Sequence, residues 1–438
     1  MVCLECKQLA RRLELALGEI VKLKAVVAKL QARLAVYDNP NTPSSKQRFP
    51  DRRREEPRGP LGRPPGFVGC TRPAPKPDRV INVRPERCKC GSKRIRVSRE
   101  FSKVVEDVEI KRVVTDFRFY ECRCLDCGRV FETTHEDLPR EGVFGPTLLS
   151  LWNALHYEGA VPFKRLAEFS EKSLGVQIMP AGVMEAIYRS AHVFQPFYDD
   201  VNESLASADY VRSDETSYSY CGEKHWFCNF SNHDVSLVKL VDSRAYTVPK
   251  QVLGSKFAGV LNTDCYPAYD SVKAGWKQKC WAHLLREAKR LSEESEEGKA
   301  FYGKLKRMHA YVKKVKEKHE EGSLKTERWT KRTVNKIREW TEHRWHQDGI
   351  RKLVKRIARY EQEWFTCLKH DFVETTNNTS EREVRKNVIA RKISGLHRSK
   401  RGAHSREIMM SVLLTTPKKG MNAYDFILQG LRAHNLNA

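Results

Sequence analysis

The sequence predicts an α/β protein in which a mixed β-sheet is interrupted by a helical insertion and preceded by three smaller modules. Two observations support this class. The spacing of apolar residues changes from helical to strand-like near residue 207, and a long stretch of charged helix, residues 285–370, separates the predicted strands from a last helical segment. Because 438 residues exceed one ordinary domain, we expect several modules along the chain.

The composition favours a polyanionic partner. Lys and Arg number 80 against 55 Asp and Glu, which gives a formal net charge of +25 and makes nucleic acid the first candidate. A soluble basic protein without such a partner is the alternative on charge alone. The sequence contains no run of eighteen apolar residues and no signal peptide, so we expect no membrane partner and a cytoplasmic location.

Residues 1–37 carry a seven-residue apolar repeat. One heptad position holds Leu13, Ile20, Val27 and Leu34, and the other holds Leu9, Ala16, Leu23 and Leu30. This pattern predicts a coiled coil that joins two or three copies of the chain. The alternative is an amphipathic helix that packs on its own domain.

Residues 38–79 are dense in Pro, Gly, Ser and Arg and predict a basic, disordered linker. Residues 46–112 contain 20 Lys or Arg against 9 Asp or Glu, a net of +11. We expect nucleic-acid phosphates to be contacted here, and the candidates are Arg52, Arg53 and Arg54. A solvated tether that contacts no nucleic acid is the alternative.

Residues 80–135 predict a small zinc ribbon. Cys88 and Cys90 form one cysteine pair, Cys124 and Cys127 form the other, and a glycine that permits a tight turn follows each pair. Four thiolates on two such turns are a common tetrahedral site for structural Zn²⁺, and the alternating residues between the pairs predict β-structure. Cys122 competes with Cys124 as a ligand, and buried cysteines without metal are the alternative.

Residues 136–205 have apolar residues three and four positions apart, which predicts a block of helices. The pattern does not separate a DNA-binding block from a packing domain.

Residues 206–284 predict a three-stranded meander, a crossover and a fourth strand. Asp214 lies in the first strand and Asp264 at the end of the fourth, so their carboxylates face each other if these strands are neighbours. Paired carboxylates bind divalent cations, and two Mg²⁺ ions about 3.5–4 Å apart support phosphodiester displacement. Glu215 points to the opposite face by strand alternation and is excluded.

Residues 371–438 supply a third carboxylate and the C-terminal helices. Residues 377–380 are of helix-capping types, so Glu381 falls in the first turn of a helix, where a carboxylate also suits the helix dipole. Glu383 faces away from a ligand at Glu381. Basic residues suited to DNA phosphates surround this acid: Arg382, Arg385, Lys386, Arg391 and Lys392.

Taken in order, these motifs resemble the IS66 family of prokaryotic insertion-sequence transposases over most of the chain. The matching motifs are NPNTPSSK in the linker, SDET around Asp214, LNTDCYPAY around Asp264, CWAHLLRE from Cys280 and TTNNTSEREVRKNVIARK around Glu381. The resemblance implies an RNase H-like fold, a DDE active site of Asp214, Asp264 and Glu381, and residues 285–370 as a helical insertion.

The resemblance also implies an enzyme that uses Mg²⁺ or Mn²⁺ to cleave transposon ends and join the freed 3′ hydroxyl to target DNA. The implied partners are double-stranded DNA in the nucleoid, a second copy or more through the coiled coil, and accessory proteins of the element. A catalytically silent DNA-binding protein and a plain RNase H-like nuclease are the rivals. The complete set of three acids argues against the first, and the coiled coil and end-binding modules argue against the second.

Two features stay open at this stage. Cys280 and His283 have the spacing of metal ligands, but two ligands cannot close a zinc site, so we favour a stabilising role near the catalytic pocket over a metal or a plain core role. The insertion has basic residues that either clamp DNA or are simply solvated: Lys304, Lys306, Arg307, Lys313 and Lys314.

Overall fold

The computed structural model describes residues 4–35, 75–83, 86–96, 99–220, 223–243, 245, 247–318, 324–394 and 397–436. The chain divides into two compact units, one of residues 49–115 and one of residues 1–48 together with 116–438. Most of the predicted linker, including Arg52, Arg53 and Arg54, lies outside the described residues. No helix among the described residues is long and apolar enough to cross a membrane.

The N-terminal repeat forms one uninterrupted helix, α1 (Leu4–Ala35). Its heptad side chains are exposed to solvent where they are described: Leu13, Ile20, Leu23, Val27 and Leu30 are each between 47% and 63% exposed. An apolar stripe of this kind fits the surface of a helix that pairs with other helices. The coiled coil itself stays a prediction.

The two cysteine pairs lie on separate turns, one in each unit. At the first turn the Gly91 N–H donates to the Cys88 carbonyl, and at the second the Gly128 N–H donates to the Cys124 carbonyl. Both glycines have positive φ, 90° and 70°, which is the conformation that the glycine was expected to permit.

The strands β1 (Glu121–Arg123) and β2 (Val130–Glu132) pair around the second cysteine turn. The longer β-structure predicted between the cysteine pairs is wrong for residues 99–120, which are described and contain no strand. Alternation of apolar residues produces a strand only when a neighbouring strand offers hydrogen bonds, and within the described part of the chain residues 99–119 pair with no strand.

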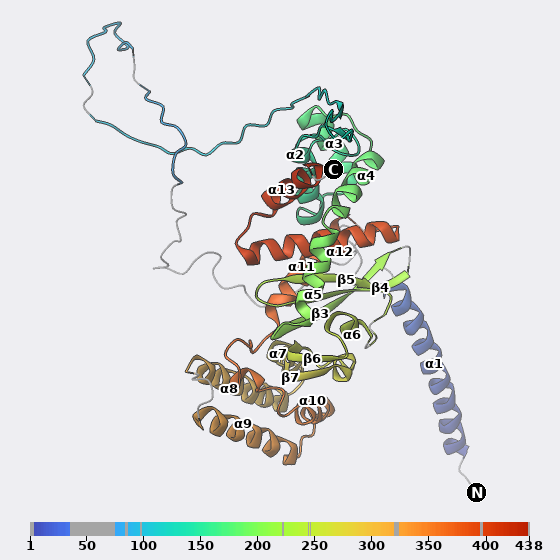
Figure 1. The fold of residues 1–438 in the computed structure, drawn as a ribbon. Coiled ribbons are helices and arrows are strands. Elements are labelled where there is room, and N and C mark those ends of the chain that lie inside the picture. The colour runs from blue at the N-terminus through green and yellow to red at the C-terminus, as the bar shows by residue number, and fades with distance from the viewer. Residues whose placement is uncertain are drawn as a thin grey trace. The chain divides into compact units, whose positions relative to one another are not determined.

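The predicted helical block consists of α2 (Pro146–Asn153), the π-turn η2 (Ala154–Glu158), α3 (Phe163–Leu174), α4 (Pro180–His192) and α5 (Gln195–Ala206). Buried side chains of the block, such as Trp152 and Ile187, share one hydrophobic core with side chains of the sheet, such as Phe227. The C-terminal helices α12 (Lys400–Thr415) and α13 (Ala423–Leu436) pack on α4 and α2 respectively (Figure 1). The block therefore packs in one core with the sheet.

The sheet has five strands in the order β5-β4-β3-β6-β7 (Figure 1). These are β3 (Tyr210–Tyr220), β4 (Glu223–Ser231), β5 (Ser236–Val241), β6 (Lys256–Thr263) and β7 (Lys273–Lys279). The first three are antiparallel, and β6 is parallel to both β3 and β7. The helix α6 (Thr247–Leu253) makes the crossover, and the turn η3 (Pro267–Ser271) connects β6 to β7. The predicted meander, crossover and neighbouring fourth strand are present, and β7 is an additional strand.

The insertion is helical, as predicted, and its hydrophobic core also includes Tyr210 and Val260 of the sheet. It consists of α7 (Trp281–Ser292), α8 (Glu296–Glu317), α9 (Leu324–Glu342), α10 (Asp348–Arg359) and the turn η4 (Thr366–Leu368). Large side chains such as Phe301, Trp340 and Trp364 are buried among these helices. The chain then returns to the sheet through α11 (Asn378–Ser394), which packs on β3 and β4, and a last turn η5 (Thr416–Lys419) precedes α13.

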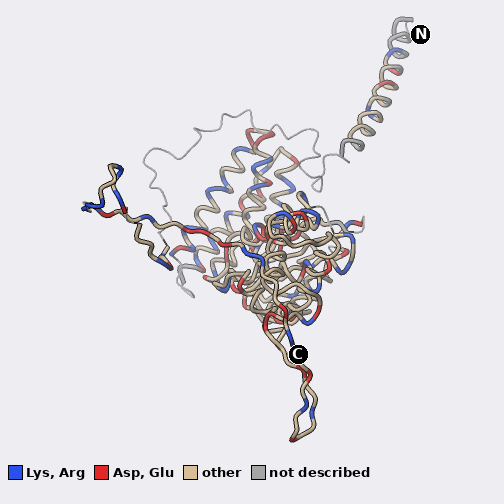
Figure 2. Tube along the Cα trace, turned by 90° about the horizontal axis from the view of Figure 1, so that it is seen from above, with Lys and Arg blue, Asp and Glu red and all other residues tan. Residues whose placement is uncertain are grey.

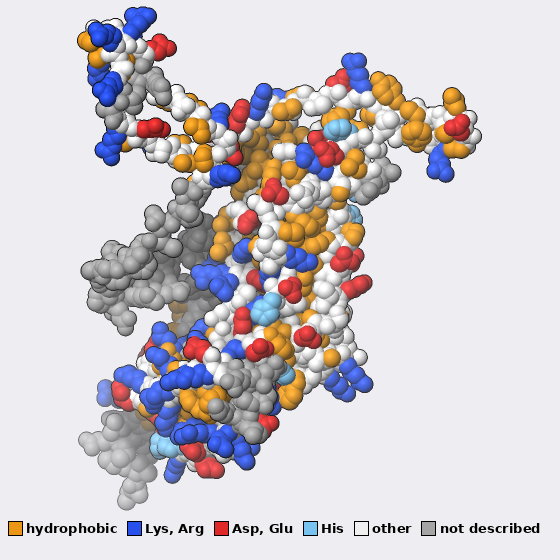
Figure 3. Space-filling model, turned by 60° about the vertical axis from the view of Figure 1, so that its left-hand side comes forward, with side chains coloured by type: hydrophobic (Ala, Val, Ile, Leu, Met, Phe, Trp, Pro, Cys, Tyr) orange, Lys and Arg blue, Asp and Glu red, His pale blue; other side chains and the backbone are white. Residues whose placement is uncertain are grey.

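The outer surface of the insertion is charged. Its helices carry both basic and acidic side chains, and basic side chains gather over it in the space-filling view (Figures 2 and 3). On α8, Lys306, Arg307, Lys313 and Lys314 are exposed. The choice between a DNA clamp and a solvated face stays open.

Candidate active site

The first acid, Asp214, lies in the middle of β3, opposite Asn229 of β4. Its neighbours Ser213 and Glu215 both hydrogen-bond to the hydroxyl of Tyr269, at 2.9 and 2.6 Å. These two residues therefore share one face of the sheet, and Asp214 belongs to the other face. The exclusion of Glu215 on strand alternation agrees with this geometry.

The second acid, Asp264, follows the last residue of β6. The parallel register pairs Arg212 with Asn262, and the same register continued by two residues brings Asp214 beside Asp264. Two hydrogen bonds hold the backbone around Asp264: its carboxylate accepts the Tyr266 N–H at 2.8 Å, and its carbonyl accepts from the buried Lys279 ammonium at 3.3 Å.

The third acid, Glu381, lies in the first turn of α11. Asn377, directly before the helix, is fully buried and joins three elements. Its amide side chain donates to the Ser213 carbonyl at 2.7 Å, its N–H donates to the Cys280 sulfur at 3.1 Å, and its carbonyl accepts the Glu381 N–H at 3.1 Å. The helix that carries the third acid is thus tied directly to the strand that carries the first.

A second set of buried hydrogen bonds fixes the same helix to the sheet. Ser380 donates to Asn229 at 2.7 Å, and Ser236 donates to the Glu383 carboxylate at 2.8 Å. Glu383 also pairs with Lys418 at 2.9 Å. Glu383 therefore faces the sheet, as expected from its position two residues after Glu381.

The three acids repel one another. The pKa of Asp214 is well above its ordinary value because the carboxyl is buried and because Glu215, Glu381 and Asp264 add negative charge around it. Within the described residues no Lys or Arg pairs with Asp214 or Asp264. Asp214 and Asp264, two crowded carboxylates without a paired cation among the described residues, fit a site for hard divalent cations, whose preferred ligands are carboxylate oxygens.

Glu381 differs from the other two acids because it has a cationic neighbour, Arg286, and a histidine whose pKa burial and Arg286 lower. Arg286 of α7 donates to its carboxylate, and His283 lies 3.4 Å from the same oxygen. In the part of the chain that the structure describes, the residues whose ligand atoms all lie within 4.8 Å of one another are Cys280, His283 and Glu381. The three acids do not form a group as close as this one among the described residues.

Cys280 has the surroundings of a structural thiol. Burial raises its pKa to about 11, so the sulfur is protonated at neutral pH and accepts the Asn377 N–H. This agrees with a stabilising role near the catalytic pocket. Sequence reasoning missed Arg286, although its position three residues after His283 on one helix was a signal that the two share a face.

The basic residues predicted around Glu381 do not all reach the surface. Arg382, Arg385 and Lys386 are exposed, and Lys392 is half-buried. Arg391 is 5% exposed, and its guanidinium donates to the Ser217 carbonyl of β3. Its predicted phosphate contact is therefore corrected to a structural bond between α11 and β3, because the side chain points into the interface of these elements.

The turns that carry the two cysteine pairs favour the thiolate forms of Cys88 and Cys124. Hydrogen bonds from the backbone of Cys90 lower the pKa of Cys88, and those from the backbone of Cys127 lower the pKa of Cys124. Thiolates are the form that binds Zn²⁺. The complete four-cysteine site stays a prediction, because its two pairs belong to different units.

Comparison with known families decides the relationship. Residues 141–405, more than half of the 438, match the model of the family described as Transposase IS66 family. The chain belongs to the IS66 transposase family. The matched region contains all three acids of this transposase, its helical block and its insertion. A search of curated proteins found no match to the chain.

Proposed function

We propose that this IS66-family transposase cleaves transposon ends and joins the freed 3′ hydroxyl to target DNA by phosphoryl transfer at Asp214, Asp264 and Glu381. One observation carries the proposal: adjacent parallel strands bring the first two acids together, and Asn377 ties the helix of the third acid to the strand of the first. The mixed order of the strands supports the RNase H-like fold that the motifs imply.

The three carboxylates would hold two Mg²⁺ or Mn²⁺ ions. Such ions, when bound, stabilise charge on the attacking and leaving oxygens and on the phosphate between them. The protein's own part is placement. Lys279 fixes the loop of Asp264, Asn377 fixes the start of α11, and His283 with Arg286 orients the Glu381 carboxylate.

The remaining modules would bring the DNA. The linker, the cysteine module with a structural Zn²⁺ on Cys88, Cys90, Cys124 and Cys127, and the helical block would recognise the terminal repeats. The coiled coil of α1 would pair two ends, since its exposed apolar stripe needs a partner helix. Deleting residues 1–36 should then reduce paired-end complexes more than binding to a single end, and equal losses would contradict the pairing.

The central test is metal-dependent cleavage of a labelled duplex that carries the element's own ends. The wild type should nick the end with Mg²⁺ or Mn²⁺, and Asp214→Asn, Asp264→Asn and Glu381→Ala should each remove the activity. Asp371→Asn, which changes an exposed carboxylate outside the site, is the matched control and should keep it.

Two other outcomes point to other functions. Tight end binding without cleavage by the wild type would favour a silent DNA-binding protein. Cleavage without joining of the 3′ hydroxyl to target DNA would favour a plain nuclease.

A further inference from the structure

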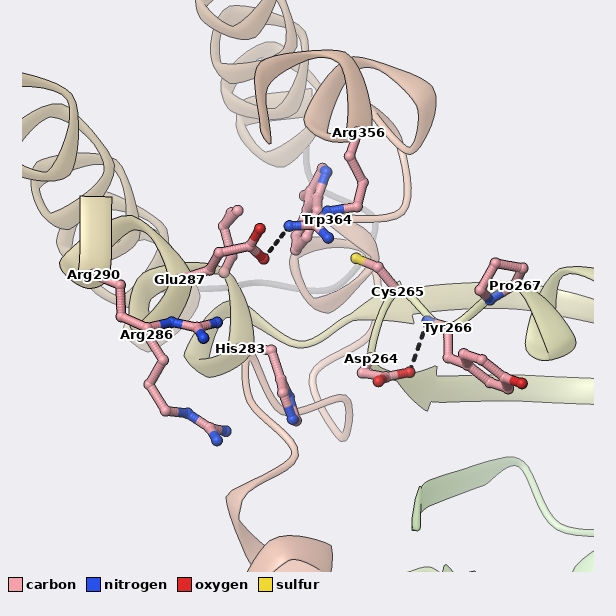
Figure 4. Close-up of a pocket in the computed structure, with 11 residues that line it drawn as sticks. Asp264, Cys265, Tyr266, Pro267, His283, Arg286, Glu287, Arg290, Arg356 and Trp364 are labelled. Atoms are coloured by element: carbon pink, nitrogen blue, oxygen red, sulfur yellow. Dashed lines mark hydrogen bonds and ion pairs between the residues drawn. The ribbon is translucent and has the colours of Figure 1, made fainter. Parts of the chain in front are cut away.

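A cavity of about 760 Å³ opens beside Asp264 (Figure 4). Its walls come from the loop after β6, from α7 and from α10, so it lies between the catalytic sheet and the insertion. Tyr266, Pro267 and Leu284 contribute apolar surface. The volume is within the usual range for sites that bind small groups or part of a larger ligand.

Three arginines line this cavity, and their partners differ. Arg356 of α10 pairs with Glu287 across the cavity (Figure 4). Arg286 pairs with Glu381, which is one of the proposed metal ligands. For Arg290 the described part of the chain offers neither an ion pair nor a side-chain hydrogen bond. Arg290 is therefore available to bind an anion in the cavity. Arg286 is paired with Glu381, which is itself proposed to bind metal.

The arrangement of the polar side chains on α7 suits a DNA strand better than a single small anion. His283, Arg286 and Arg290 are spaced at three and four residues, so they lie on one face of α7. With a rise of about 1.5 Å per residue, Arg290 lies about 6 Å further along the helix than Arg286. The row starts with His283 and Arg286 beside Glu381, and Arg290 lies further from the three acids.

We propose that this cavity binds a phosphodiester group of the DNA strand next to the phosphate that is cleaved, with Arg290 as its main ligand. Arg286, one turn closer to the acids, donates to the same strand when it leaves Glu381. Strand entry and the release of Glu381 are thereby linked through one guanidinium. This inference rests on the proposed function, because it takes transposon-end DNA as the ligand.

The first test measures binding without catalysis. Fluorescence anisotropy with a labelled transposon-end duplex, without added Mg²⁺ or Mn²⁺, compares the wild type with Arg290→Gln. Loss of a charge-assisted contact should weaken binding about tenfold and reduce the slope of log affinity against log salt by about 1. Lys289→Gln is the matched control, because Lys289 is the exposed residue before Arg290 and does not line the cavity. It should change the affinity less than twofold.

The second test locates the contact. Each phosphate near the cleavage point is replaced in turn by an uncharged methylphosphonate, and binding is measured with wild type and Arg290→Gln. One position within two nucleotides of the cleaved phosphate should weaken the wild type but not the variant, as a double-mutant cycle requires of a direct contact. Two results would overturn the inference. One is an Arg290→Gln variant that binds DNA as tightly as Lys289→Gln. The other is a loss of affinity that is the same at every substituted phosphate in both proteins.

The two proposals fail separately. If the wild type binds ends through Arg290 at one phosphate but never nicks them, the proposed phosphate site is supported and the proposed cleavage activity is contradicted. A wild type that nicks ends while Arg290→Gln binds like the control contradicts the cavity alone. Arg290 is exposed, so an unchanged unfolding midpoint checks that its variant is folded.

Discussion

Replacing Asn377 with Ala tests whether this buried amide positions the catalytic helix. The substitution removes the 2.7 Å hydrogen bond to the Ser213 carbonyl, one residue before the first acid. It leaves the backbone bonds of residue 377 to Cys280 and Glu381 in place. The change is therefore confined to the bond that joins β3 to the start of α11.

The expected loss follows from burial. Asn377 and Ser213 are 0% and 1% exposed, so the freed carbonyl cannot bond to water and costs about 1–3 kcal/mol. The oxygen of the Asn377 amide has no partner among the described residues, and its removal offsets part of this cost. We expect a net loss of about 2 kcal/mol in the free energy of unfolding. A shift of Glu381 by an ångström would slow nicking by roughly 100-fold.

The assay pairs urea unfolding, followed by tryptophan fluorescence, with nicking of a transposon-end duplex. Asn378→Ala is the control, since Asn378 is adjacent but exposed. It should stay within about 0.5 kcal/mol of the wild type. The reasoning is refuted if Asn377→Ala matches this control in both stability and nicking rate.

Three further predictions concern other parts of the chain. Burial, together with the charge of Arg406, lowers the pKa of His156 from 6.5 to about 3. Its neutral ring therefore stabilises the fold fully above pH 6.5. As the pH falls towards 3, this contribution to the free energy of unfolding decreases by about 1 kcal/mol per pH unit. His156→Gln should reduce this dependence of the urea midpoint on pH. Lys279→Met should destabilise the chain by about 3 kcal/mol, because Lys279 is 1% exposed and lies 3.6 Å from Glu363, which would be left unpaired. For the predicted coiled coil, the wild type should sediment as an oligomer and Leu23→Lys as a monomer, since Leu23 occupies an apolar heptad position of α1.

Each of these has a matched control at an exposed position. His192→Gln should keep the wild-type acid dependence, Lys273→Met should keep the stability, and Lys24→Gln should keep the oligomer. A variant that cannot be told from its control contradicts the corresponding argument. In the case of His156, other buried histidines such as His397 leave part of the acid dependence in place.

Much of the fold could be predicted from local patterns in the sequence. The change from helical to alternating spacing near residue 207 coincides with the start of β3 at Tyr210, and the charged stretch from 285 onward is helical. The acids Asp214 and Glu381 lie in the strand and the helical turn that were expected. These predictions succeed because side-chain period and capping residues act within one element.

Tertiary contacts decided the rest. The strand β7 and the loss of β-structure over residues 99–120 depend on whether a neighbouring strand is present, which period alone does not reveal. Three sets of contacts join residues 90 or more positions apart: the bond of Arg391 to β3, the ion pair of Arg286 with Glu381, and the bonds of Asn377 to Ser213 and Cys280. Local sequence patterns were enough to predict the three candidate acids and the strand or helix that positions each. Their hydrogen-bond and ion-pair partners became known only from the folded chain, because these interactions act through space between elements that lie far apart in the sequence.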